Sequence, residues 1–77
     1  MTDAEARAVA DASDMIINGY AYTRRGDGVS VFNLRTGKAT VFTANREVSE
    51  TSMDDMDLTL ARRYLVQNER FLEHVDA

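Results

Sequence analysis

The stretch from residue 20 to residue 43 constrains the fold most, because β-branched and aromatic residues are concentrated in three short runs along it. The Gly-Asp-Gly sequence at 26–28 supplies the backbone freedom that a tight hairpin turn needs. The Arg-Thr-Gly-Lys sequence at 35–38 fits a type I turn closed by a glycine bulge. The stretch therefore predicts an antiparallel meander of three strands, at about residues 20–25, 29–34 and 39–43.

Both faces of this meander are expected to carry large apolar side chains. One face is expected to gather Val29, Val31, Ala39 and Val41, with Tyr20 and Tyr22 added if the first hairpin has a two-residue loop. The opposite face is expected to gather Ala21, Phe32, Leu34 and Phe42. Antiparallel sheets commonly keep one face polar, so a sheet with two apolar faces needs a cover on each. One helix is not enough to cover both.

An alanine-rich segment precedes the meander and predicts a helix over about residues 3–17. Thr2 or Asp3 is expected to cap its N-terminus. Asn18-Gly19 has two interpretations, namely the left-handed C-cap of this helix or the tight turn of a hairpin. We take the helix as the prediction and keep the hairpin as the alternative.

The last segment has the clearest amphipathic period in the chain and predicts a helix over about residues 53–75. Ser49, Thr51 and Ser52 are its candidate N-caps. Its apolar stripe consists of Met53, Met56, Leu60, Ala61, Tyr64, Leu65, Phe71, Leu72 and Val75. The predicted fold is a small single-domain α+β protein with the element order α-β-β-β-α.

Length and composition limit how such a fold is stabilised. A domain of 77 residues buries only about 60% of the surface that its unfolded chain exposes, so its core is thin. The chain has no cysteine and a single histidine, His74, which excludes disulfides and thiolate metal sites and leaves too few ligands for a histidine zinc site. Oligomerisation remains as a way to stabilise a core of this size, and we expect a homodimer or a tight complex with another protein. No secretion signal or membrane span is recognisable, which predicts a cytoplasmic protein.

The net charge of −4 is distributed in three blocks of alternating sign. Residues 1–19 carry four acidic residues and one arginine, residues 20–46 carry five basic residues and one aspartate, and residues 47–77 carry eight acidic residues and three arginines. The basic block coincides with the predicted sheet and the acidic blocks with the predicted helices. This arrangement restricts which charged partner can bind at which surface.

Two nucleic-acid hypotheses arise from this arrangement. The element order resembles that of double-stranded-RNA-binding domains, but the aspartates within residues 53–57 would repel phosphate at the start of the second helix, so this function is rejected. The second hypothesis places the basic sheet in a DNA groove. Its candidate contacts are Arg24, Arg25, Arg35, Lys38 and Arg46. Basic residues at hairpin ends have another explanation, because they block edge-to-edge pairing of sheets. Nucleic-acid binding is therefore kept as the alternative function.

Catalysis and metal binding find little support in the sequence. Serine and threonine nucleophiles need an activating base, and the single imidazole of His74 lies near the end of the sequence. The acidic run from Glu47 to Asp57 matches no metal-binding loop, and the dipole of the following helix explains carboxylates at its start. The integrin-type tripeptide at residues 25–27 lies in a predicted turn. We predict no enzyme activity, no cofactor and no metal.

We therefore expect a non-enzymatic protein-interaction or regulatory module whose second apolar sheet face is closed by another protein or by its own copy. The expected partner contacts on the sheet are Tyr20, Tyr22, Val31 and Val41. The residues expected to give electrostatic recognition are Glu47, Glu50, Asp54, Asp55 and Asp57. In size, charge and topology the chain is similar to small inhibitors and regulators encoded by phages and mobile elements, anti-CRISPR proteins among them.

Overall fold

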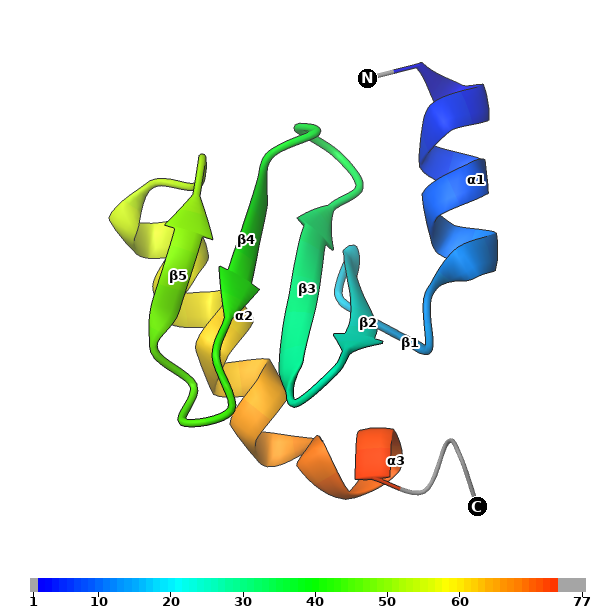
Figure 1. The fold of residues 1–77 in the computed structure, drawn as a ribbon. Helices are drawn as coiled ribbons and strands as arrows, with labels where there is room; N and C mark the ends of the chain where they lie inside the picture. Colours follow the sequence, from blue (N-terminus) through cyan, green and yellow to red (C-terminus); the bar gives the residue numbers. More distant parts are fainter. Residues whose placement is uncertain (1, 74–77) are drawn as a thin grey trace.

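The computed structural model describes residues 2–73, which form one antiparallel sheet with helices before and after it (Figure 1). The helices are α1 (Asp3–Ala12), α2 (Asp55–Gln67) and α3 (Glu69–Glu73). The strands are β1 (Met15–Ile17), β2 (Tyr20–Arg25), β3 (Gly28–Asn33), β4 (Ala39–Phe42) and β5 (Val48–Thr51), hydrogen-bonded in that order. The α+β class is confirmed, whereas β1 and β5 extend the predicted three-stranded meander to five strands.

The Asn18-Gly19 pair turns a hairpin, so the predicted helix over residues 3–17 is wrong in its second half. Asn18 and Gly19 both have positive φ, at 51° and 84°, as a type I′ hairpin turn requires. The turn pairs β1 with β2, and this pairing brings Met15 and Ile17 against the hydrophobic core. As part of a strand, these two side chains are partly buried and their backbone is hydrogen-bonded to β2. A longer α1 would provide neither of these interactions.

A two-residue turn at Gly26 and Asp27 joins β2 to β3, which meets the condition under which Tyr20 and Tyr22 share a face with Val31. Gly26 has a φ of 60°, which a type II′ turn requires at its first central position. Gly28 begins β3 and lies directly against β4, where a Cβ atom would overlap the backbone carbonyl oxygen of Phe42. A side chain at position 28 would therefore force β3 and β4 apart.

The pairing of β3 with β4 corrects the predicted composition of the two sheet faces. Val31 lies opposite Thr40, and the pair of strands has no register shift. The turn keeps its left-handed glycine, Gly37, with a φ of 78°, but the Asn33 N–H donates to the carbonyl oxygen of Lys38 at 2.8 Å, so the loop is one residue longer than the predicted faces require. A difference of one residue moves every side chain of a strand to the other face. As a result Val41 shares a face with Phe32, and Phe42 shares a face with Val31.

α2 covers one face of the sheet and forms the hydrophobic core with it (Figure 1). The hydroxyl of Tyr22 donates a hydrogen bond of 2.9 Å to the backbone carbonyl oxygen of Ala61, which ties β2 to the middle of α2. The buried core residues are Tyr20, Tyr22, Val29, Val31, Phe42, Met53, Ala61, Leu65 and Leu72.

β5 is not predictable from its polar sequence Val-Ser-Glu-Thr, which lacks the apolar alternation of a strand. It is the edge strand beside β4, and three of its four residues are exposed. The hydroxyl of Thr40 donates to the carbonyl oxygen of Glu50 at 3.0 Å, and the N–H of Ala39 donates to the Ser52 hydroxyl at 3.0 Å. The predicted helix N-caps Ser49, Thr51 and Ser52 therefore lie in or beside β5.

The single helix predicted over residues 53–75 is divided at Asn68. Asp54 is the N-cap of α2, and its carboxylate accepts from the N–H of Asp57 at 2.8 Å. At the other end, Asn68 leaves the helical conformation with a φ of −124°, and both its backbone N–H and its side-chain amide donate to the carbonyl oxygen of Tyr64, at 3.1 and 2.9 Å. The last predicted helical residues, with His74 and Val75, lie outside the described residues.

Candidate functional site

The sheet face opposite α2, called the open face below, carries apolar side chains in register. The first row across β1–β4 consists of Ile16, Ala21, Phe32 and Ala39. The second row across β2–β5 consists of Thr23, Ser30, Val41 and Glu50. Figure 1 shows α2 behind β3, β4 and β5, and no helix among residues 2–73 in front of these strands.

The open face combines exposed apolar surface with one acidic side chain. Ile16 is 49% exposed and Phe32, Ala39 and Val41 are half-buried, whereas Ala21 is buried on β2, the strand that α1 contacts. A hollow of about 290 Å³ lies over β4 and β5, beside Ala39, Val41 and Glu50. Part of the apolar row is therefore exposed to solvent, and a partner could cover this apolar surface.

The structure places three of the four predicted sheet contacts in the core. Tyr20, Tyr22 and Val31 are 3%, 0% and 0% exposed and lie beneath α2. Val41 lies on the open face instead, because β4 pairs with β3 one residue away from the predicted register. Val41 is therefore the one of these four residues that a partner can reach on the sheet.

The predicted acidic recognition run is spread over several elements rather than gathered on one surface. Glu47 lies in the turn before β5, and Glu50 lies on the open face. Asp54 and Asp55 are exposed at the start of α2. Asp57 is partly buried and contacts the sheet.

Asp57 joins α2 to two strands through hydrogen bonds. Its Oδ1 accepts from the Tyr20 hydroxyl at 2.7 Å, and its two oxygens lie 3.4 and 3.3 Å from the side-chain nitrogen of Asn33. Burial and the hydrogen bond to Asp57 raise the pKa of Tyr20 to about 12, so this phenol remains a donor at neutral pH. Burial also raises the pKa of Tyr22. These contacts give Asp57 a structural role.

Asn33 connects the same cluster to the β3–β4 turn, and sequence reasoning does not single it out. It is 5% exposed, and its Oδ1 accepts from the backbone N–H groups of Arg35 and Thr36 at 2.9 and 3.3 Å. An asparagine directly before a turn sequence is the available signal, because its side chain caps such turns.

Replacing Asp57 with asparagine is expected to lower the free energy of unfolding by about 2 kcal/mol, because it removes the charged acceptor of the Tyr20 and Asn33 hydrogen bonds. Urea denaturation followed by circular dichroism measures this loss. Asp55→Asn is the matched control, since Asp55 is exposed in the same helical turn and the charge change is identical. Equal losses in both variants would show that the helix dipole accounts for the effect.

The basic residues considered for nucleic acid lie at opposite ends of the sheet. Arg24 and Arg25 end β2, whereas Arg35 and Lys38 belong to the β3–β4 turn. The six residues of β3 separate the two ends by about 20 Å. The Arg24 side chain donates to the carbonyl oxygen of Leu72 at 3.3 Å. These cations therefore do not form one continuous patch.

The residues that the structure describes contain no group of three or more histidine, cysteine, aspartate or glutamate side chains placed to hold a metal ion. None of the helices between residues 2 and 73 is both long enough and apolar enough to cross a membrane.

Comparison with known proteins gives one relationship. The search of curated proteins finds no match, and the search of solved structures finds none either. A family model described as a family of unknown function (DUF7723) matches residues 3–72. Because this match spans most of the chain, the protein belongs to that family.

Proposed function

We propose that this chain is a non-enzymatic protein-interaction module of a regulatory kind, and that it binds a second copy of itself through the open face. The observation that carries the proposal is the apolar row from Ile16 to Ala39, which lies in register on the face that α2 leaves uncovered. An apolar sheet face loses contact with water when a second sheet packs against it.

The dimensions of the molecule support a partner of its own size. It measures 31 × 28 × 19 Å, and one sheet with one helical layer accounts for the short dimension. The two longer dimensions bound a face large enough for a standard interface, which buries about 800 Å² on each partner. A two-fold dimer uses the same surface on both copies, so it requires a face that complements itself.

The charges at the two edges of the open face are self-complementary. Arg25 follows Thr23 by two residues on β2 and so belongs to the same face, and it is exposed. Glu50 lies on β5 at the other edge and is also exposed. A two-fold axis parallel to the strands and between β3 and β4 places β2 of one copy over β5 of the other. Thr23 then faces Glu50, and Arg25 lies two residues further along β2, about 7 Å away, where its long side chain can reach the Glu50 carboxylate in both halves of the interface.

Light scattering coupled to size-exclusion chromatography tests this proposal. The wild-type protein is expected to elute with twice the 8.6 kDa mass of one chain, and Val41→Lys is expected to elute as a monomer. Val66→Lys is the matched control, because Val66 is 54% exposed on α2, away from the open face, and the substitution is the same. A wild-type monomer, or equal dissociation of the two variants, would overturn the proposal.

A charge exchange tests the orientation of the two copies. Arg25→Glu and Glu50→Arg are each expected to weaken the dimer several-fold, because each puts like charges across the interface. The double variant is expected to recover most of the wild-type affinity, measured by sedimentation equilibrium. Failure of the double variant to recover would rule out the two-fold arrangement described above.

A further inference from the structure

A second hollow, of about 180 Å³, lies at the end of the sheet where the β2–β3 turn meets the β4–β5 turn and α3. Two arginines, two carboxylates and two glycines contribute most of its lining: Arg24, Arg46, Asp27, Glu69, Gly26 and Gly28. It is called the arginine pocket below. The open face and the contacts proposed for the dimer do not include these residues.

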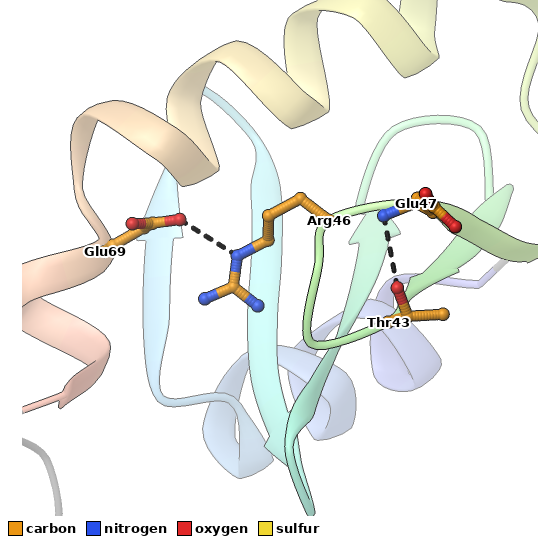
Figure 2. A network of polar contacts seen from close by, with 4 residues as sticks. All are labelled: Thr43, Arg46, Glu47 and Glu69. Atoms are coloured by element: carbon orange, nitrogen blue, oxygen red, sulfur yellow. Dashed lines mark hydrogen bonds and ion pairs between the residues drawn. The ribbon is translucent and has the colours of Figure 1, made fainter.

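Arg46 occupies a backbone position that normally suits glycine. Its φ of 64° is left-handed, a conformation that is unfavourable for a residue with a side chain. It closes the β4–β5 turn, where its N–H donates to the carbonyl oxygen of Thr43 at 2.9 Å and the Glu47 N–H donates to the Thr43 hydroxyl at 3.2 Å (Figure 2). Non-glycine residues with a strained backbone cluster at functional sites.

The guanidinium of Arg46 is only partly used within the protein. Its Nε donates to Oε1 of Glu69 at 3.0 Å, and this ion pair fixes the direction of the side chain (Figure 2). Its Nη1 is buried and has no hydrogen-bond partner among the described residues. An unpaired buried donor on a charged group is unfavourable, and an acceptor in the pocket relieves this cost when the side chain turns Nη1 toward it.

We propose that the arginine pocket binds a carboxylate group of a small molecule or peptide, received by Arg46. Glu69 and Asp27 offset the charges of the two arginines, so the pocket has no net positive charge to hold a dianion, and the ligand is held by hydrogen bonds from the guanidinium. A planar carboxylate matches the fork of a guanidinium, whereas a phosphate dianion would meet repulsion from Asp27 and Glu69. The volume of about 180 Å³ accommodates a carboxylate with a few attached carbon atoms.

Titration of the ¹⁵N-labelled full-length protein with sodium acetate tests the proposal, with sodium chloride at equal ionic strength as the reference. Acetate is expected to shift the amide signals of Gly26, Gly28 and Arg46 and the Nε signal of Arg46, and to saturate in the millimolar range. Arg46→Gln is expected to weaken this binding about tenfold or more, the loss expected for a charge-assisted hydrogen bond. Arg63→Gln is the matched control, because Arg63 is exposed on α2.

The same titration is repeated with a second variant, Arg46→Lys, and with inorganic phosphate in place of acetate. Arg46→Lys keeps the charge but lacks the fork, so it is expected to fold as the wild type does and to bind acetate more weakly. Inorganic phosphate is expected to bind more weakly than acetate. Equal shifts in chloride, unchanged acetate binding in Arg46→Gln or Arg46→Lys, or tighter binding of phosphate than of acetate would each overturn the assignment.

Discussion

Replacing Tyr22 with alanine is expected to lower the free energy of unfolding by about 3–5 kcal/mol, the cost typical of truncating a buried aromatic residue. Tyr22 is 0% exposed and lies between the sheet and α2, so its removal leaves a cavity that the backbone cannot close. A domain of 77 residues has a total stability of about 4–12 kcal/mol. Urea denaturation followed by circular dichroism should therefore show a largely unfolded variant at modest denaturant concentrations.

Tyr22→Phe separates packing from hydrogen bonding at the same position. It removes only the hydroxyl that donates to Ala61 at 2.9 Å and is expected to cost about 1 kcal/mol. The Ala61 carbonyl keeps its acceptor role within α2, so no buried acceptor is left unpaired. If Tyr22→Phe lost as much stability as Tyr22→Ala, the hydroxyl rather than the ring would hold β2 to α2.

Replacing Gly28 with alanine is expected to cost about 3 kcal/mol, at the upper end of the range for overpacking. The added Cβ would overlap the backbone carbonyl oxygen of Phe42, and a backbone atom in a paired strand cannot move aside as a flexible side chain does. The strands β3 and β4 must then separate where Val29 pairs with Phe42. Thermal unfolding by circular dichroism measures the loss.

Gly26→Ala is the control for this variant, because Gly26 lies in the same turn. No atom lies within 4 Å of a Cβ at Gly26, and its φ of 60° leaves only backbone strain, about 1 kcal/mol. A loss at Gly26 equal to or greater than that at Gly28 would show that turn conformation, and not the close approach of β4, sets the requirement for glycine at position 28.

Local chemistry made β2, β3 and β4 predictable, because their β-branched and aromatic residues and the Gly26-Asp27 turn act over a few residues. The same local chemistry left Asn18-Gly19 undecided, since asparagine and glycine serve a helix end and a type I′ turn equally well. The polar sequence of β5 gives no strand signal at all. Only the hydrogen bonds that β4 offers make residues 48–51 a strand.

In the candidate site too, some features follow from local sequence and others only from tertiary contacts. The sequence predicts Val41 on the same face as Tyr20, Tyr22 and Val31, but the longer β3–β4 loop moves it to the open face, where Glu50 of the predicted acidic run also lies. The special position of Arg46 depends on its left-handed φ and on Glu69, which is 23 residues away. No local pattern reports such a contact.

The sequence by itself therefore determined the α+β class, the central strands and the amphipathic helix, because periodicity and turn chemistry act between near neighbours. The tertiary structure alone decided which face of the sheet α2 covers, how many strands pair, and which acids and arginines meet. The physical reason is that strand register depends on a single residue, and a shift of one exchanges the buried and open faces. Asp57 illustrates the difference, since its place at a helix start is local but its contacts with Tyr20 and Asn33 exist only in the folded chain.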